Sequence, residues 1–221
     1  MNFQKRTRFA PTPSGYLHIG NVFNLLLTYL TSKFEGAQLG LRIDDIDRRR
    51  FRLEYLEDIF DLSDFLGIEF EFGPSGIDDF ELNFSQLKYY DKYKNYLNEI
   101  NDTFLCDCTR KTLSNNISNI YPGTCRNRNL GKGSGNNLKT RLKIIRDHDI
   151  YYFKGDIVKQ FDIQITIGDF ILWNHLEDRP SYQLVSTVHD IEDGISLIVR
   201  GKDLLESTFS QEFLRYIFDE E

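Results

Sequence analysis

The chain has 221 residues, 40% of them hydrophobic and 14% aromatic, a composition that excludes intrinsic disorder and allows a sizeable core. No apolar run approaches the ~20 residues that a membrane span needs, and the N-terminus lacks the apolar segment of a signal peptide, so we expect a cytoplasmic protein without membrane contact. A net charge of −7 excludes a general nucleic-acid binder, because phosphate contact requires cations, and any RNA partner would need a local basic patch.

Strand and helix patterns alternate through the first hundred residues. Residues 7–10 predict a short strand, and the apolar run from Val22 to Phe34 predicts a buried helix that ends at Gly36. Residues 37–45 predict a second strand, and helical spacing returns in 53–67. A turn is expected at 73–76, followed by a helix over 85–100 whose inward face is Leu87, Tyr90, Tyr93, Leu97 and Ile100.

The pattern changes from Thr103 to Ser181, where short strand-like pieces surround an exposed low-complexity loop at 126–137. Residues 162–173 predict a hairpin or a sheet edge. A helix over 182–193, a strand over 194–201 and a helix over 206–218 then follow. Alternation at both ends predicts an α/β protein whose parallel domain is split by an insertion, with segments 1–101, 102–180 and 181–221.

The stretch "RFAPTPSGYLHIGN", from Arg8 to Asn21, joins the first strand to the first helix. Prolines stiffen such a turn, glycines let the backbone approach a ligand, and unpaired N–H groups at the helix start attract anions. His18 would add a hydrogen-bond donor for phosphate. The alternative is a rigid turn in which His18 only caps the helix.

Three blocks in order carry a family resemblance. "RFAPTPSGYLHIG", "LRIDDIDRRR" (41–50) and "SYQLVSTVHDIEDGISLIVRGKDLLEST" (181–208) together resemble the glutamyl form of the class I aminoacyl-tRNA synthetases. The resemblance implies a Rossmann-like nucleotide-binding domain, split by a mixed α+β insertion of zinc type. It also implies a monomeric ligase that activates L-glutamate with ATP and Mg²⁺ and passes it to tRNA.

Site residues follow from the same resemblance. The phosphates would be handled by His18, Gly20 and Asn21, with Pro13 and Gly15 beside ATP. Glutamate would lie against Arg8, Phe9, Ala10, Pro11, Thr12, Asp44, Tyr182 and Arg200. Two arginines and one acid match two carboxylates and one ammonium. The family has Glu at position 44, and Asp is shorter by one C–C bond, roughly 1.5 Å. The alternative for Arg8, Asp44 and Arg200 is ordinary ion pairing.

Three clustered cysteines without an export signal favour a metal site or plain thiols over disulfides. "CDC" (106–108) and "YPGTC" (121–125) resemble the zinc module of the glutamyl-queuosine tRNA(Asp) synthetase branch. The resemblance implies a structural Zn²⁺ held by Cys106, Cys108, Tyr121 and Cys125. Phenolate is an unusual zinc ligand, and His148, distant in the sequence, is the alternative to the tyrosine. It also makes queuosine in the tRNA(Asp) anticodon the expected acceptor of glutamate.

A KMSKS-type loop, which the family carries further along, is not found among these 221 residues. The chain is therefore expected to be a degenerate relative, part of a longer or two-chain enzyme, or a slow enzyme. A glutamate–tRNA ligase core and a non-catalytic ATP- and glutamate-binding paralogue are the alternative functions. The middle segment is locally basic, and an RNA-facing patch or a solvated loop both fit Arg126, Arg128, Lys132, Lys139, Arg141 and Lys143.

Overall fold

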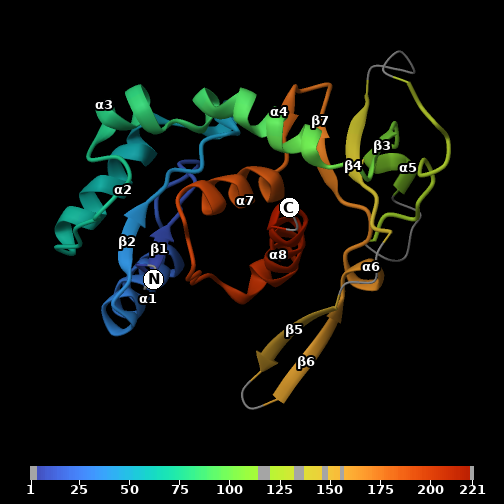
Figure 1. The fold of residues 1–221 in the computed structure, drawn as a ribbon. Helices are drawn as coiled ribbons and strands as arrows, with labels where there is room; N and C mark the ends of the chain where they lie inside the picture. Colours follow the sequence, from blue (N-terminus) through green and yellow to red (C-terminus); the bar gives the residue numbers. More distant parts are fainter. Residues whose placement is uncertain (1–3, 114–119, 132–136, 146–148, 155–156, 220–221) are drawn as a thin grey trace. The chain divides into compact units, whose positions relative to one another are not determined.

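The computed structural model describes residues 4–113, 120–131, 137–145, 149–154 and 157–219 (Figure 1). The chain divides into two compact units, unit 1 (1–92 and 190–202) and unit 2 (93–189 and 203–221). The three segments expected from the sequence stay a prediction, because a compact unit need not coincide with an inserted module.

The helices and strands succeed one another along the chain without a repeated unit. They are β1 (Arg6–Phe9), α1 (Ile19–Glu35), β2 (Gln38–Leu41), the 3₁₀ turn η1 (Arg48–Arg50), α2 (Leu53–Phe65), α3 (Ile77–Asp79), the π-turn η2 (Phe80–Phe84), the 3₁₀ turn η3 (Gln86–Tyr89), α4 (Tyr90–Glu99), β3 (Thr103–Cys106), α5 (Arg110–Leu113), β4 (Lys139–Leu142), β5 (Asp149–Lys154), β6 (Ile157–Asp162), α6 (Ile163–Thr166), β7 (Ile171–Asn174), β8 (Arg179–Pro180), α7 (Tyr182–Glu192), the 3₁₀ turn η4 (Lys202–Leu204) and α8 (Leu205–Asp219).

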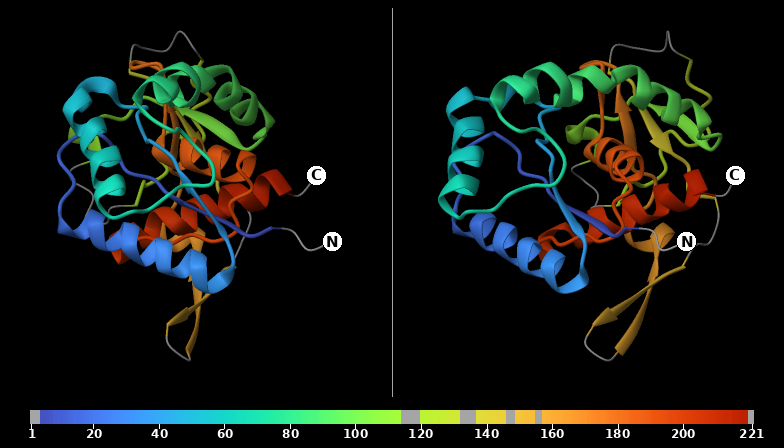
Figure 2. Two further views of the ribbon diagram at one scale, coloured as in Figure 1. Left: turned by 90° about the vertical axis from the view of Figure 1, so that its left-hand side faces the viewer. Right: turned by 60° about the vertical axis from the view of Figure 1, so that its left-hand side comes forward.

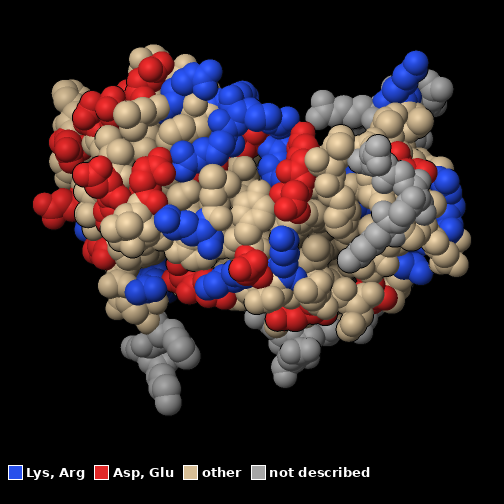
Figure 3. All heavy atoms as spheres, turned by 90° about the horizontal axis from the view of Figure 1, so that it is seen from above, with Lys and Arg blue, Asp and Glu red and all other residues tan. Residues whose placement is uncertain are grey.

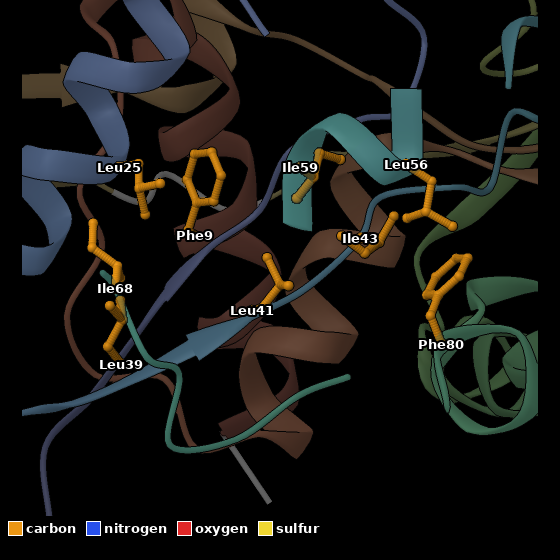
Figure 4. Close-up of a cluster of buried hydrophobic side chains, with 9 residues drawn as sticks. All are labelled: Phe9, Leu25, Leu39, Leu41, Ile43, Leu56, Ile59, Ile68 and Phe80. Atoms are coloured by element: carbon orange, nitrogen blue, oxygen red, sulfur yellow. The ribbon is translucent and has the colours of Figure 1, made fainter. Parts of the chain in front are cut away.

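Unit 1 is built on the parallel pair of β1 and β2, in which Arg8 lies opposite Gly40. Helix α1 connects the two strands and runs beside them (Figure 2). This is the parallel α/β arrangement that the alternating pattern predicts. The core of unit 1 joins both strands to α1, α2 and η2 (Figure 4), and its buried residues are Phe9, Leu25, Leu39, Leu41, Ile43, Leu56, Ile59, Ile68 and Phe80.

Helix α1 is longer and far less buried than the sequence predicts. It begins at Ile19 and ends, as expected, at Gly36 in the left-handed conformation. Its buried residues are Leu25, Thr28 and Ser32, whereas most of its large apolar side chains lie on the opposite face and are exposed. The expectation of a buried helix was therefore wrong, because the face that packs on the strands is the one with the smaller side chains.

The strand expected over 194–201 is also absent from the described structure. The N–H groups of Ser196 and Leu197 both donate to the carbonyl of Arg6, each at 3.0 Å. Two donors that share one acceptor do not form a ladder, so this segment lies beside β1 without becoming a strand.

The helix expected over 85–100 and the hairpin expected over 162–173 need correction as well. The first begins as the 3₁₀ turn η3, so Leu87 lies exposed while Tyr93 and Ile100 are buried. In the second, the side chain of Asp162 accepts from the N–H of Ile165 and caps helix α6, and β7 follows.

Unit 2 contains an antiparallel sheet in the order β3–β4–β7–β8 and the separate hairpin of β5 and β6. Apolar side chains from β4, β7, α6 and α8 form its core, which consists of Ile100, Leu142, Ile144, Ile163, Leu172, Phe209, Phe213 and Leu214. In the described part of the chain, every helix is too short or too polar to cross a membrane.

Gly73 tests whether the close approach of the chain to strand β2 constrains the fold of unit 1. Its φ is +98°, and a Cβ there would lie 2.0 Å from the carbonyl oxygen of Leu41. Gly67 has a similar left-handed backbone, φ +63°, with open space around it. We expect Gly67→Ala to cost ~1–2 kcal/mol, the ordinary penalty of a left-handed L-residue. We expect Gly73→Ala to cost clearly more, because the backbone of β2 must move. Urea unfolding measures both, and equal losses would show that the close approach is not a constraint.

Candidate functional site

Four charged side chains meet in unit 1 at the carboxyl ends of β1 and β2. Arg8 binds Asp190 in a fork, with Nε–Oδ1 and Nη2–Oδ2 distances of 3.0 Å. Arg42 donates from Nη1 to Oδ1 of Asp190 at 2.6 Å and from Nε to Oδ1 of Asp44 at 2.8 Å. All four side chains are buried. The carboxyl ends of parallel strands are where α/β proteins commonly bind their ligands.

The cluster alternates in sign and is neutral overall. Burial acts to raise the pKa of Asp190, but the charges of Arg42 and Arg8 outweigh it and bring this pKa to about 2. Asp44 also accepts from Nε2 of Gln86 at 2.8 Å. Both carboxylates thus accept hydrogen bonds from internal donors, so each has fewer acceptor positions left for a ligand.

Arg8 keeps one donor group free within the described chain. Its Nε and Nη2 are both taken by Asp190, while Nη1 has no hydrogen-bond acceptor among the described residues. A bidentate partner fixes the plane of a guanidinium. Arg8 therefore has a set orientation and a remaining edge for another carboxylate.

Sequence reasoning missed three members of this network, namely Arg42, Asp190 and Gln86. Arg42 and Asp190 lie inside the quoted blocks, at positions with no assigned role. Two arginines near the ends of adjacent strands require two buried counter-charges, and Asp44 supplies one of them. The excess of one buried positive charge over the one predicted acid was the signal in the sequence for a second buried acid.

His18 caps helix α1. Its Nδ1 accepts from the N–H of Gly20 at 3.1 Å, and Oδ1 of Asn21 accepts from the N–H of His18 at 3.1 Å. Because Nδ1 is an acceptor, a neutral His18 ring carries its proton on Nε2. His18 therefore caps the helix, as the alternative interpretation of the sequence expected. The cap uses only Nδ1, so the exposed ring still has a hydrogen-bond donor at Nε2.

A side chain at Gly20 would meet the His18 ring in its observed position. A Cβ at residue 20 would lie 2.9 Å from Cε1 and 3.0 Å from Nδ1 of His18. Gly15, in contrast, has open space around it. Of the two glycines, only Gly20 is so close to the His18 ring that an added Cβ would collide with it.

The other residues predicted to bind glutamate or ATP differ in how accessible they are to a ligand. Phe9 lies in the core, and its carbonyl accepts from Arg42, so its side chain is not available. Pro11 and Pro13 are buried and Ala10 is partly buried, while Thr12 is exposed. Arg200 belongs to the segment after α7, which lies beside α1 through a 3.5 Å hydrogen bond from Asn24 Nδ2 to the Val199 carbonyl. Tyr182, partly exposed at the start of α7, belongs to unit 2.

The cysteines of unit 2 come together as predicted. The Sγ atoms of Cys106, Cys108 and Cys125 lie within 4.8 Å of one another. Tyr121 Oη is 3.4 Å from Sγ of Cys106 and 3.8 Å from Sγ of Cys108. Around a tetrahedral zinc with Zn–S bonds of ~2.3 Å, sulfur atoms would be ~3.8 Å apart and an oxygen ~3.5 Å from sulfur. The donor set fits such an ion, while His148 lies outside the described residues.

The thiols differ in their electrostatic surroundings. Burial raises the pKa of Cys108 to about 11. Burial also acts to raise the pKa of Cys106, but hydrogen bonds from Tyr121 and Arg141 outweigh it and lower this pKa. The guanidinium of Arg141 lies 3.9 Å from the centre of the Tyr121 ring.

The basic side chains of the middle segment largely support this cluster. Arg141 is buried, Arg128 pairs with Asp107, and Lys139 Nζ donates to the carbonyl of Cys108 at 3.0 Å. Arg126 donates to the Ile144 carbonyl. Lys132 lies outside the described residues. Most of these cations therefore have internal partners and are not a solvated, phosphate-facing surface.

Comparison with known proteins places these features in a family. The family model described as "tRNA synthetases class I (E and Q), catalytic domain" matches residues 4–219. The chain is 31% identical to a glutamate–tRNA ligase of Sulfurihydrogenibium sp., covering 94% of this chain and 46% of that protein. It is 30% identical to glutamate–tRNA ligase 1 of Nitrosococcus oceani, covering 98% and 46%.

The fold has counterparts among solved structures. The glutamate–tRNA synthetase of Elizabethkingia anophelis superposes with a TM-score of 0.78 at 23% identity, over 99% of this chain and 48% of that one. The chain spans about half the length of the curated relatives that it matches. With its Rossmann-like fold and a match over nearly all of its residues, the chain belongs to the class I tRNA synthetases of the E and Q type, as their catalytic domain.

Proposed function

We propose that the protein activates L-glutamate with ATP and transfers it to tRNA, as part of a glutamate–tRNA ligase of the cytoplasm. The observation that carries the proposal is the paired cluster of Arg8, Arg42, Asp44 and Asp190 at the strand ends. The family and the relatives named glutamate–tRNA ligase support it. In the proposed reaction a carboxylate oxygen of glutamate attacks the α-phosphorus of ATP, and pyrophosphate leaves.

The amino acid would be bound by residues that are already fixed. The free Nη1 edge of Arg8 would meet one carboxylate, and Asp44, held by Arg42 and Gln86, would face the ammonium. Arg200 is proposed to complete this pocket, and a role for Tyr182 stays a prediction. Asp190 acts as a positioning residue, because it touches Arg8 and no proposed ligand atom.

The phosphates would meet the start of α1. The positive end of the α1 dipole and the Nε2–H of His18 would form the anion site, while the N–H of Gly20 is already used by the His18 ring. Mg²⁺ bound to ATP would neutralise the charge that develops on the departing pyrophosphate. The N–H of Gly20 holds the His18 ring at Nδ1, and Oδ1 of Asn21 holds the backbone N–H of His18, so the two residues together set where the Nε2 donor lies.

A contact surface for tRNA is proposed on exposed cations outside the middle segment. Figure 3 shows Lys and Arg atoms gathered in one region of the face that it draws. In unit 1, Arg49, Arg50, Arg52 and Lys88 are exposed. Arg50, Arg52 and Lys88 form no ion pair within the described chain, so they have charge to offer a phosphate backbone.

The tyrosine beside the cysteines favours a second candidate for the RNA that receives glutamate. The Cys-x-Cys and Tyr-x₃-Cys elements lie at ligand distances from one another, as the resemblance to the glutamyl-queuosine tRNA(Asp) branch requires. On this proposal, Zn²⁺ is structural and the acceptor is queuosine in tRNA(Asp). Exchange of pyrophosphate into ATP without any tRNA would favour this branch, and exchange only with tRNA(Glu) would favour the ligase.

Glutamate-dependent ATP–pyrophosphate exchange tests the activity, with His18→Asn as the informative variant. Asparagine retains an N-cap but has no donor at the Nε2 position, so we expect a ~10²–10³-fold lower rate with little change in melting temperature. His18→Ala should lower both. The absence of exchange in the zinc-loaded wild type, with and without tRNA(Glu), would instead identify a non-catalytic binding protein.

Asp190→Asn tests the charge cluster. It leaves two buried arginines without their shared anion, and we expect a loss of ~3–5 kcal/mol in unfolding free energy at pH 7. Because the folded pKa lies near 2, the stability that Asp190 contributes is present above pH ~4 and is lost as the pH falls toward 2.

Asp193→Asn is the matched control for that experiment. Burial raises the pKa of Asp193, so its charge costs stability at pH 7 and its removal should be neutral or stabilising. Urea unfolding at pH 7 and pH 4 measures both variants. Equal losses of unfolding free energy in the two variants would show that the charge cluster does not stabilise the fold through Asp190.

Metal content tests the zinc site. We expect close to one equivalent of zinc in protein prepared without chelator, and its loss in Cys106→Ser with a lower melting temperature, because the cluster replaces an apolar core there. Tyr121→Phe separates a three-sulfur site from one that includes the phenol. Full zinc occupancy in Cys106→Ser would be incompatible with the proposed ligand set.

A further inference from the structure

A group of buried hydrogen bonds lies behind Asp44 in unit 1. The next residue, Asp45, has a buried carboxylate. Its Oδ1 accepts from the backbone N–H of Gln86 and its Oδ2 from the hydroxyl of Ser85, each at 2.7 Å. Nη2 of Arg48 adds an ion pair to Oδ2 at 2.6 Å. The carboxylate of Asp45 thus fixes the start of η3 against the segment that follows β2.

The side chain of Gln86 returns to the same segment. It is buried, its Oε1 accepts from the N–H of Ile46 at 3.0 Å, and its Nε2 donates to Oδ1 of Asp44 at 2.8 Å. Backbone and side chain of this one residue therefore bind three successive positions, 44, 45 and 46. The amide has one favourable orientation, because turning it over would set its NH₂ group against the N–H of Ile46.

Both sides of this arrangement are attached to the framework of unit 1. Phe80 lies in the core, and its carbonyl accepts from the N–H of Ser85 at 2.9 Å, directly before Gln86. On the other side, the N–H of Asp44 donates to the carbonyl of Pro11 at 2.9 Å. The position of the Asp44 carboxylate is therefore set by buried contacts that reach the core.

The two oxygens of Asp44 are engaged unequally. Nε of Arg42 and Nε2 of Gln86 both donate to Oδ1, each at 2.8 Å. Nη2 of Arg42 lies 3.5 Å from Oδ2, at the limit of hydrogen-bond range. An arginine and a carboxylate by themselves favour a fork of two parallel bonds. The donor from Gln86 thus favours a one-sided arrangement in which Oδ2 is the more available oxygen.

We propose that Gln86, anchored by Asp45, is a positioning residue that keeps Oδ1 of Asp44 occupied and so presents Oδ2 to the α-ammonium of glutamate. The inference rests on the proposed function, because it concerns the site in which glutamate would lie. Gln86 acts through Asp44, and Asp45 acts through Gln86. Without the Gln86 donor, Asp44 would turn toward a full fork with Arg42, and the ammonium would meet a carboxylate with both oxygens engaged.

Glutamate and glutarate are the ligands that test this inference. Glutarate has the two carboxylates of glutamate but no α-ammonium, so its binding does not depend on Oδ2 of Asp44. Calorimetry on the full chain measures both dissociation constants, with competition titrations for the weaker ligand. We expect the wild type to prefer glutamate at least ~100-fold, because a site built for a polar group rejects a ligand that lacks it.

Gln86→Met is the informative variant. Methionine has nearly the length of glutamine but no donor for Oδ1, so we expect the preference for glutamate to fall ~10-fold, the effect of one hydrogen bond to a charged group. The affinity for glutarate should not change. Gln38→Met is the matched control, because Oε1 of Gln38 accepts from Nε of Arg6 at 3.0 Å, at the opposite end of β2. It should leave the preference as it is.

Asp45→Asn is the second variant, and it decides the matter if Gln86→Met does not fold, which circular dichroism shows. The single carbonyl oxygen of asparagine cannot replace both carboxylate oxygens, so the same selective loss of glutamate is expected. An unchanged preference in the folded variants, an equal loss of both ligands, or an equal effect of Gln38→Met would each overturn the inference and leave the proposed function intact. A wild type that binds glutamate no better than glutarate would overturn the proposed amino-acid site, and this inference with it.

Discussion

The buried carboxylate of Asp190, placed between Arg8 and Arg42, is the interaction on which unit 1 depends. Arginines at the ends of two parallel strands would be costly to bury without a counter-charge, and Asp190 comes from a distant part of the sequence. It therefore ties the last turn of α7 and the segment after it to the first two strands. The same fork fixes the plane of Arg8, so one contact serves both the packing and the proposed recognition of glutamate.

Much of the fold could be read from the sequence because local signals were strong. The alternation of strand and helix, Gly36 at the end of α1, and the helices over α2, α7 and α8 follow from periodicity and end signals. The errors came where long-range partners decide the outcome. The segment from Gly194 to Gly201 has the composition of a strand, but the N–H groups of Ser196 and Leu197 both donate to the one carbonyl of Arg6.

The candidate site was predictable in part for a similar reason. Arg8, His18, Asp44 and the cysteines stand in recognisable blocks, and the three cysteines are close in space. What a sequence does not reveal is how each donor is already engaged. Nothing local indicates that His18 uses Nδ1 for its own helix, or that Gln86 holds Asp44 from 42 residues away. Likewise, the apolar pattern of α1 indicates a helix but not which of its faces the strands cover.

The cysteine cluster has a practical consequence for anyone handling the protein. The sulfur atoms of Cys108 and Cys125 are only 3.5 Å apart, and a disulfide bond needs ~2.05 Å. A metal-free sample exposed to air has therefore only a small movement to make before the two thiols join. That bond would remove two of the three sulfur ligands, so a preparation stripped by chelator and then oxidised would resist reloading until a reductant restores the thiols.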